Sequence, residues 1–393
     1  MTSLVFRTTL AVSLLACSTL GFAETAEAPA TAEPAAATVE AVEAPAEPAA
    51  ETPAAPAAAP SAIAVTLPDL DPDAYFKGQT GGTFGKNATK VLPGNKRVGV
   101  AGFRVIFITQ NSIKAQVRAS YFGGTDRSGA SARMDVGLDG VDTATLQAIT
   151  DKAYADFLAQ LALAGREVVP QAELQAFLGQ VEVTAQPYSK EVTLGYGKQT
   201  GVAFAPTGMP LWFTNWDMPW GDKNPFKQHN IRSFAKTSEQ LNAMLVAPMI
   251  VVDFAQMSSS GNRSGFLARE AEVGATLSMS VSAFTTPLTR AEKTSSGIVT
   301  KGDDAAISLQ QPFISEIGFA SLEKVKEEDN SATKGIFDAI GNAMGMANAG
   351  GMARSKSANA ARTNNDAFRE AAGDALGRAT GTFAAWFKKY PAP

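Results

Sequence analysis

A strict alternation of apolar and small or polar residues runs from Val273 to Ala283. Val, Ala, Leu and Met occupy the odd positions, and Gly, Thr and Ser occupy the even ones. A period of two puts the two sets on opposite faces of an extended chain, so the segment is predicted to be a half-exposed β-strand. An antiparallel strand that covers a layer of helices fits this pattern. The length also suits a membrane-spanning strand that one copy contributes to an oligomeric pore.

Other periodicities predict the elements around this strand. β-Branched and aromatic runs favour strands, and apolar residues spaced by three and four favour helices. The predicted strands are residues 98–109, 166–169, 243–254 with a possible break at Pro248, 298–300, 305–309 and 314–325. The predicted helices begin at Asp142 or Thr143 and end at Gly165, span 170–178, and span 366–390. Residues 123–142 are rich in Gly, Ser and Asp and are predicted to be a loop. This order favours one α/β sandwich, with a mixed sheet, antiparallel later strands and a long C-terminal helix.

The N-terminal residues are predicted to be an export signal followed by a linker. Residues 1–23 combine Arg7, an apolar stretch too short for a transmembrane helix, and a small-residue cleavage site. Residues 24–64 consist almost entirely of Ala, Pro, Glu, Thr and Val, which cannot supply a core, and are predicted to be a disordered linker. Residues 65–393 are therefore predicted to form a single α/β domain.

Cys17 is the only cysteine, so the folded domain is expected to contain no disulfide. The run from Leu14 to Cys17 resembles a bacterial lipobox, in which Cys17 becomes the lipidated first residue of the mature chain. The alternative is cleavage after Ala23, which discards Cys17. In either case the signal predicts a periplasmic protein or one on the periplasmic face of the outer membrane.

Charge and composition exclude several classes of function. The net charge is −4 and no Lys/Arg cluster occurs, which argues against nucleic-acid binding. With one His and one Cys, no metal, cofactor or catalytic residue is predicted. His229 is expected to be a solvated loop residue. Asp69, Asp71 and Asp73 lack the Gly and Glu of a calcium loop and are expected to be solvated or to cap a turn.

The candidate binding surface lies in a predicted insertion, residues 187–236. Three of the four tryptophans fall within it, in a run punctuated by proline and glycine that cannot be a regular helix or a central strand. The candidate residues are Trp212, Phe213, Trp216 and Trp220. Two interpretations remain open: an exposed contact surface for a partner, a ligand or a membrane interface, or rings that fold back as a small separate core.

A second predicted insertion, residues 341–362, is rich in Gly, Ala, Ser and Met. Because glycine destabilises a helix by roughly 1 kcal/mol per residue, a disordered loop is favoured over a close-packed helical hairpin.

Several fragments together resemble the curli-transport lipoprotein (CsgG-like) superfamily and the related TolB N-terminal fold. The fragments are KRVGVAGFRVIF, ITDKAYADFLAQLALAGREVVPQAELQAFL, APMIVVDFAQMSSS and ATLSMSVSAFTTPLTRAEKTSSGIV, together with the C-terminal amphipathic helix. The resemblance covers residues 96–180 and 240–390. It departs from the family at VVDFAQM, which lacks the expected glycine, and neither insertion has a counterpart. It implies an α/β domain and, as one possibility, pore formation.

These observations predict a non-catalytic exported cell-envelope protein. Its expected role is accessory to assembly, secretion or surface attachment, through binding to other envelope proteins or to a membrane interface. The alternatives are an oligomeric outer-membrane secretion pore of the CsgG type, which implies a homo-oligomer, and an envelope hydrolase that uses paired carboxylates. No residue spacing supports the hydrolase.

Overall fold

The computed structural model describes twelve stretches of the chain. They are residues 65–80, 91–117, 120–122, 125–127, 130–195, 197–214, 216–221, 229–262, 270–295, 297–301, 305–325 and 353–390. All of them belong to one compact unit, residues 62–393. The predicted signal, the predicted linker and Cys17 lie outside the described residues.

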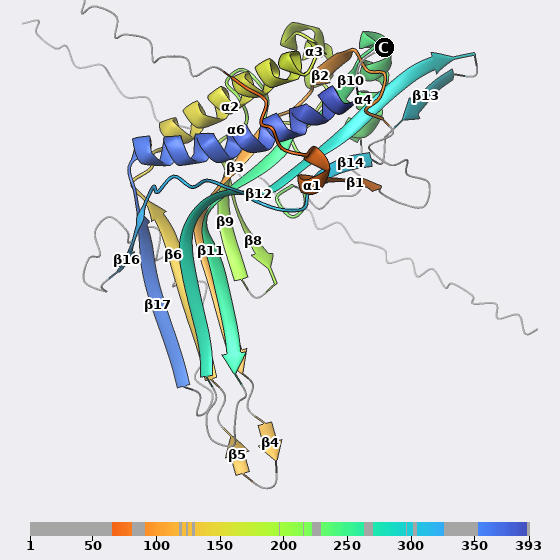
Figure 1. Cartoon of the computed structure of the whole chain (residues 1–393). Helices are drawn as coiled ribbons and strands as arrows, with labels where there is room; N and C mark the ends of the chain where they lie inside the picture. The colour runs from red at the N-terminus through yellow and green to blue at the C-terminus, as the bar shows by residue number, and fades with distance from the viewer. Residues whose placement is uncertain are drawn as a thin grey trace, which may run out of the picture. The chain divides into compact units, whose positions relative to one another are not determined.

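A large mixed β-sheet is the centre of this unit (Figure 1). Along its main path the strands are β16 (Ser321–Lys324), β17 (Ala353–Arg362), β6 (Ala130–Asp139), β3 (Arg104–Val117), β11 (Met249–Asn262), β12 (Glu270–Thr294), β10 (Met244–Val246), β2 (Arg97–Val100) and β7 (Glu167–Val168). Six further strands belong to the same sheet but lie off this path: β1 (Phe76–Thr80), β8 (Tyr188–Leu194), β9 (Gly197–Phe204), β13 (Gly297–Lys301), β14 (Ala305–Leu309) and β15 (Phe313–Ile314). The short strands β4 (Ser120–Phe122) and β5 (Thr125–Arg127) pair only with each other. The predicted fold class is confirmed.

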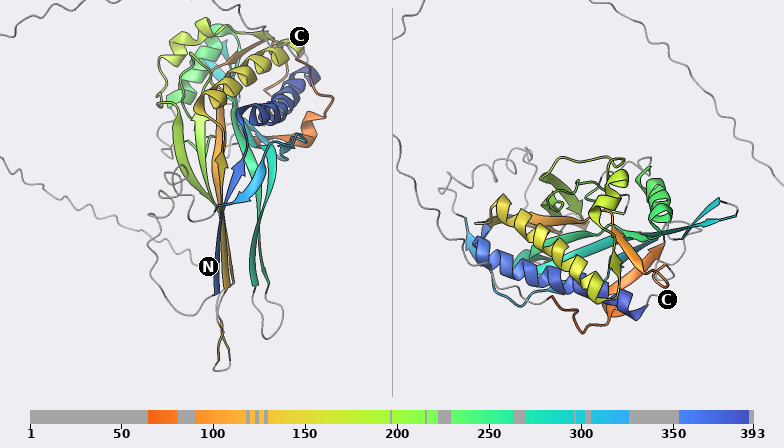
Figure 2. Two further views of the ribbon diagram at one scale, coloured as in Figure 1. Left: turned by 90° about the vertical axis from the view of Figure 1, so that its left-hand side faces the viewer. Right: turned by 90° about the horizontal axis from the view of Figure 1, so that it is seen from above.

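Two long helices lie side by side over this sheet: α2 (Thr143–Leu163) and α6 (Asn365–Lys389) (Figure 2). The Asp142 carboxylate accepts a hydrogen bond from the Thr145 amide at 2.7 Å, which satisfies a donor that the helix leaves free. Gly165 follows the helix with a φ of 79°, the left-handed conformation that favours glycine. Both predicted ends of this helix are confirmed. The shorter helices are α1 (Pro72–Tyr75), α3 (Gln171–Leu178) and α4 (His229–Leu241).

Aromatic side chains fill the space between α6 and its neighbours. Phe383 is fully buried and lies against Phe157 of α2, Phe284 of β12 and Phe76 of β1, with ring centroids 5.9, 5.1 and 5.8 Å away. Each buried ring contributes about 1.5–3 kcal/mol. The core therefore lies under the helices and holds this half of the sheet rigid.

One predicted loop region is largely strand, which corrects the sequence interpretation. Residues 123–142 were predicted to be a loop, but most of them form β5 and β6. In β6 the polar residues Ser131, Arg133 and Asp135 alternate with apolar ones, so a real period of two is hidden by a loop-like composition. The predicted insertion, residues 187–236, contains regular elements: β8 and β9 join the main sheet beside β3, and α4 begins at His229.

The predicted disordered loop at 341–362 is also partly wrong. Residues 353–362 form β17, which runs parallel to β6 along its whole length. Residues 341–352 lie outside the described chain. Ala, Ser, Asn and Arg have little intrinsic preference for a strand, so this strand depends on its pairing with β6. The predicted strand 98–109 is divided into β2 and β3, and the predicted break at Pro248 separates β10 from β11.

Candidate functional site: two strand ribbons

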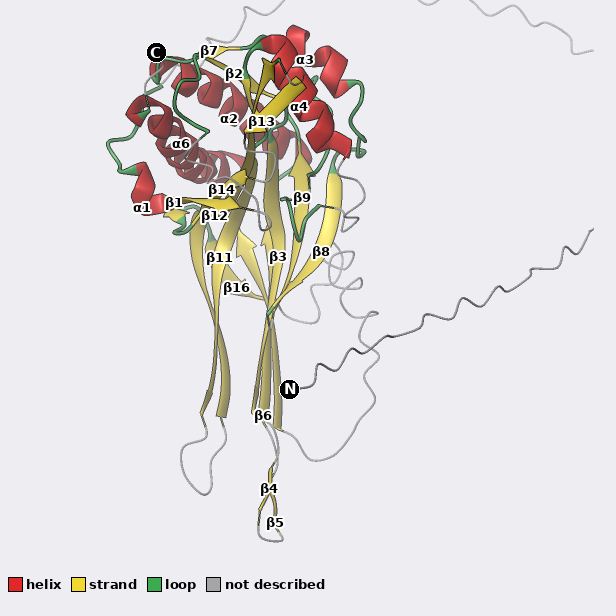
Figure 3. Ribbon diagram, turned by 90° about the vertical axis from the view of Figure 1, so that its right-hand side faces the viewer, coloured by secondary structure: helices red, strands yellow, loops and turns green. Residues whose placement is uncertain are grey.

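Two ribbons of strands run out from the sheet beyond the helices (Figure 3). The first ribbon comprises β17, β6 and residues 110–117 of β3; the second comprises residues 253–262 of β11 and 270–280 of β12. Near the helices, β3 and β11 pair in parallel, at residues 104–107 and 249–252. Farther out, neither strand pairs with the other. One sheet therefore divides into two ribbons.

The first ribbon is amphipathic. The register pairs Ala115 with Ala132 and Val117 with Ala130, so the apolar residues of β3 and β6 share one face. All four of these side chains are buried. The opposite face carries Lys114 and Gln116 of β3, which are exposed, and Ser131 and Arg133 of β6.

The second ribbon has the same construction. Residues 255, 257, 275 and 277 lie on one face as Ala, Met, Ala and Leu, and residues 256, 258, 274 and 276 lie on the other as Gln, Ser, Gly and Thr. The predicted alternation between Val273 and Ala283 is thus seen in β12. Met257, Ala275 and Leu277 are partly buried against the main core, whereas Gln256 and Thr276 are exposed.

The apolar faces of the ribbons stack on each other. β12 is in contact with β6 although the two strands do not pair, and the side chains on the apolar face of each ribbon are buried or partly buried. The small residues Ala130, Ala132 and Ala275 allow such a close approach. The polar faces are left on the outside.

Both ribbons have open edges in the described chain. On β17, residues 353–358 pair only with β6, because β16 covers no more than residues 359–362. On β12, residues 270–278 pair only with β11, because the pairing with β15 begins at Ser280 and the Met279 carbonyl accepts a hydrogen bond from the Ser315 amide. An unpaired strand edge presents free N–H and C=O groups, which another chain can extend.

A buried polar cluster ties the base of the ribbons together. The Asn111 side-chain amide of β3 donates to Asp253 of β11 at 2.8 Å, and Gln199 of β9 donates to both Asn111 and Asp253, also at 2.8 Å. The Ala255 amide donates to the same carboxylate at 3.2 Å, where the β11–β12 register shifts. Burial raises the pKa of Asp253, and the hydrogen bonds from its neutral donors, which favour the charged carboxylate, offset this shift only in part.

Two of the four candidate residues in the tryptophan run are buried, which contradicts the exposed-surface interpretation for those two rings. Trp212 and Trp220 expose 0% and 4% of their area, and Phe213 and Trp216 are half-buried. The Trp212 indole donates to the Ala101 carbonyl at 3.2 Å and lies 5.7 Å from Phe177 and 5.8 Å from Phe234, between ring centroids. Trp212 belongs to a second core under α3 and α4, as the alternative interpretation predicted, whereas Trp220 is part of the main core.

A buried ion pair fixes this run to the sheet. Arg104, at the start of β3, and Asp217 are fully buried and lie 2.7 Å apart. Arg104 also donates to the Ala247 carbonyl at 2.9 Å and lies 5.4 Å from the Trp212 ring centroid. Burial lowers the pKa of Arg104 and raises that of Asp217, and the opposite charges oppose both shifts. Nothing in the sequence spacing marked Arg104 as the partner of Asp217.

The structure also shows where His229, Asp71 and Asp73 lie. His229 begins α4, so its prediction as a loop residue is wrong; its side chain lies outside the description. The Asp71 carboxylate caps α1 by accepting from the Asp73 amide at 3.2 Å, as expected. Asp73 accepts from Trp386 Nε1 at 2.6 Å and pairs with Lys389, which lowers its pKa.

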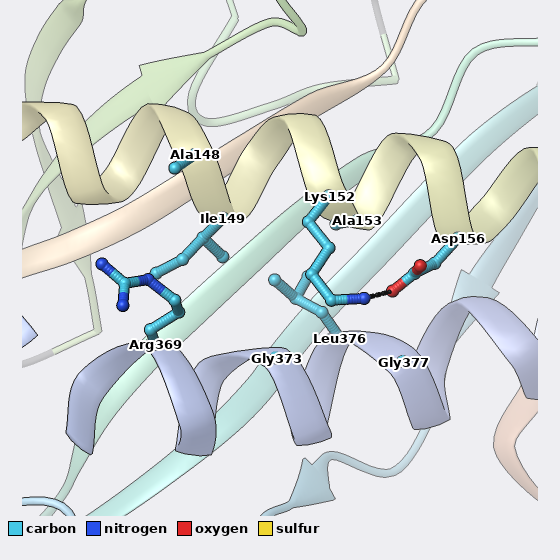
Figure 4. A pocket seen from close by; sticks show the side chains of 9 residues that line it. All are labelled: Ala148, Ile149, Lys152, Ala153, Asp156, Arg369, Gly373, Leu376 and Gly377. Carbon is cyan, nitrogen blue, oxygen red and sulfur yellow. Dashed lines mark hydrogen bonds and ion pairs between the residues drawn. The ribbon is translucent and has the colours of Figure 1, made fainter. Parts of the chain in front are cut away.

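A shallow pocket lies between α2 and α6 (Figure 4). Small residues, among them Gly373 and Gly377, line its floor, and Lys152 pairs with Asp156 at 2.6 Å along its side. Its volume of about 40 Å³ holds a few water molecules at most. In the described stretches no group of three or more His, Cys, Asp or Glu side chains could hold a metal ion. None of the described helices has the length and apolar character needed to cross a membrane.

Comparisons with known proteins give no relative: no family model, no curated protein and no solved structure matches this chain.

Proposed function

We propose that this chain is a non-catalytic, exported envelope protein that assembles with copies of itself into a pore. The two ribbons are the parts that would line and close the pore wall. The observation that carries the proposal is that both ribbons are amphipathic and have open edges. Assembly through those edges would satisfy the backbone groups that a single copy leaves unpaired.

The ribbons have suitable dimensions and polarity. A membrane-spanning strand needs about 9–11 residues with alternating polarity. β6 spans Ala130–Asp139, and the outer parts of β11 and β12 span 253–262 and 270–280. If the stacked faces part, the apolar face of each ribbon can meet lipid and the polar face can line the channel. The resemblance to the CsgG-like superfamily supports the same function.

The accessory role through the tryptophan run has less support. Two of the four candidate residues, Trp212 and Trp220, are buried in the fold and offer no surface to a partner. A hydrolase has less support still, because the buried carboxylates Asp217 and Asp253 accept hydrogen bonds from the chain's own donors. The pore is therefore favoured over the accessory role.

A vesicle-leakage experiment tests the proposal. The mature protein, purified from cells, is added to calcein-loaded vesicles of phosphatidylethanolamine and phosphatidylglycerol. We expect release of the dye, and ring-shaped particles in detergent by negative-stain electron microscopy. Intact vesicles together with a monomer or a small oligomer in detergent would overturn the pore and favour the accessory role.

Two neighbouring residues of β12 give a matched pair of variants. Leu277 lies on the apolar face and Thr276 on the exposed polar face. Arginine on a lipid-facing position costs about 2–4 kcal/mol per copy at the membrane midplane. We expect Leu277→Arg to abolish dye release and Thr276→Arg to retain it with altered ion selectivity. Circular dichroism of both variants shows whether any loss comes from unfolding. Equal leakage by the two folded variants would contradict the assigned faces.

A further inference from the structure

Taking the proposed function as the premise, we infer that β17 is a removable cover on one edge of β6, and that β11 of the same chain takes this edge when the pore forms. In the described chain, one edge of β6 pairs with β3 and the other pairs with β17 (Figure 1). The pairing with β17 continues from Ala130 to Asp139, the whole length of β6. While β17 is in place, β6 therefore has no free edge.

The strand β11 is the neighbour that this edge of β6 would otherwise meet. One edge of β3 pairs with β11 at residues 104–107 and then with β6 at residues 110–117, while β9 pairs with the opposite edge. Beyond Val252, β11 pairs in the described chain only with β12, so the edge that faced β3 is open. In a flat continuation of the sheet, β6 would therefore lie between β3 and β11.

The strand directions fit a pair of β6 with β11. β3 and β11 run parallel to each other, β6 runs antiparallel to β3, and β12 runs antiparallel to β11. The order β3, β6, β11, β12 therefore alternates in direction, as the strands of bacterial outer-membrane barrels do. β17 runs parallel to β6 and makes the only parallel pair among the described residues of the two ribbons. Between β6 and β11 it would break the alternation.

The side chains of β17 suit a cover in water better than a barrel wall in lipid. Ser355 and Ser357 are in register with Ala132 and Met134 on the apolar face of β6, so β17 would present hydroxyl groups to lipid there. Lys356, on the other face, is exposed. Proteins protect strand edges from unwanted pairing by covering them and by placing lysine on the outermost strand. β17 does both for the first ribbon.

Only the outer part of β17 has to leave. Residues 359–362 pair with β16 as well as with β6, and Ala360 and Ala361 expose only 2% and 0% of their area. Residues 353–358 pair with β6 alone. The outer part is thus held along one edge, by a parallel pairing that is slightly less stable per residue than an antiparallel one. It can detach while the inner part stays anchored.

A disulfide lock tests the cover. Ser355→Cys with Ala132→Cys joins β17 to β6 at two residues in register. Gln256→Cys with Thr276→Cys is the matched lock in the second ribbon, between β11 and β12, which remain partners in both states. Cys17 is the only natural cysteine and is predicted to be cleaved off or lipidated, so it supplies no competing thiol. Each variant, as the unassembled mature protein, is added to the calcein-loaded vesicles oxidised and again after reduction with dithiothreitol.

We expect the oxidised β17–β6 lock to lose dye release and ring assembly, and reduction to restore both. The oxidised β11–β12 lock should release dye as the unaltered protein does. Release by the oxidised β17–β6 lock at the unaltered rate would overturn the cover and leave the pore standing. Loss of release by both oxidised locks would also overturn it, because stiffening of either ribbon would then suffice. If the unaltered protein releases no dye and forms no rings, the proposed function fails, and this inference fails with it.

A proline variant acts in the opposite direction. Consecutive N–H groups of a strand point to opposite sides, so one of those at positions 354 and 355 faces β6. Arg354→Pro with Ser355→Pro removes that donor and weakens the pairing of the outer part of β17. We expect this variant to release dye faster than the unaltered protein. Slower release by a variant with unchanged circular dichroism would contradict the cover.

Discussion

Trp212 is expected to be one of the largest single contributors to the stability of this fold. The side chain is completely buried, its indole donates to the Ala101 carbonyl at 3.2 Å, and its ring lies between Phe177 and Phe234. Trp212→Ala removes these contacts and leaves a cavity, a change that costs about 3–5 kcal/mol in buried cores. It also uncovers the Arg104 guanidinium, which lies 5.4 Å from the ring centroid.

We therefore expect Trp212→Ala to lower the free energy of unfolding by about 4 kcal/mol, a large fraction of the 5–15 kcal/mol typical of a domain. Urea unfolding followed by far-ultraviolet circular dichroism measures this loss, because it does not depend on the fluorescence of the deleted ring. Trp216→Ala is the matched control, since Trp216 belongs to the same run but is only half-buried. A loss of less than about 1 kcal/mol at Trp212, or a larger loss at Trp216, would refute the assignment of Trp212 to the core.

Three further variants test the local energetics. Asp217→Ala leaves Arg104 buried without its carboxylate and should cost about 3–5 kcal/mol in urea unfolding; a loss below 1 kcal/mol would show that the pair is not buried in solution. Asp142→Ala removes the α2 cap and should lower the urea midpoint, measured the same way; an unchanged midpoint would contradict the cap. Because burial raises the folded-state pKa of Asp253, the folded state binds the proton more tightly than the unfolded chain. The stability of the unaltered protein relative to Asp253→Asn should thus be greatest below about pH 4 and fall as pH rises through the raised pKa. A difference that is flat from pH 4 to pH 8 in urea unfolding would contradict the raised pKa.

The helices α2, α3 and α6 and most of the core strands could be predicted because their signals are local, whereas α1 and α4 were not predicted. Asp142 and Gly165 mark the ends of α2 by capping and by left-handed backbone, and the alternation from Val273 to Ala283 marks β12. These features need no distant partner to form. The fold class followed from their order.

The ribbons were missed where their strands depend on distant partners. β17 has a composition that suits a loop, and it is extended because β6 offers it an edge. The burial of Trp212 was not decided by the sequence either, since an exposed ring and a buried ring look identical in a loop rich in Pro and Gly. What buries the ring is α3 and α4, through Phe177 and Phe234, and the contact with Phe177 joins segments far apart in sequence. Tertiary contacts of this kind override local preference.

The side chains of the two halves of the sheet bear on the proposed assembly. Beneath α6 the sheet is held by rings such as Phe383, each worth about 1.5–3 kcal/mol when buried. Between the ribbons the apolar side chains include Ala132 and Ala275 as well as the larger Met257 and Leu277, and Ala275, Met257 and Leu277 are only partly buried. Partly buried side chains contribute less than fully buried rings, so the ribbons can part at lower cost than the core. Stacked, they hide their apolar faces from water, and the cluster around Asp253 marks the level at which that separation would stop.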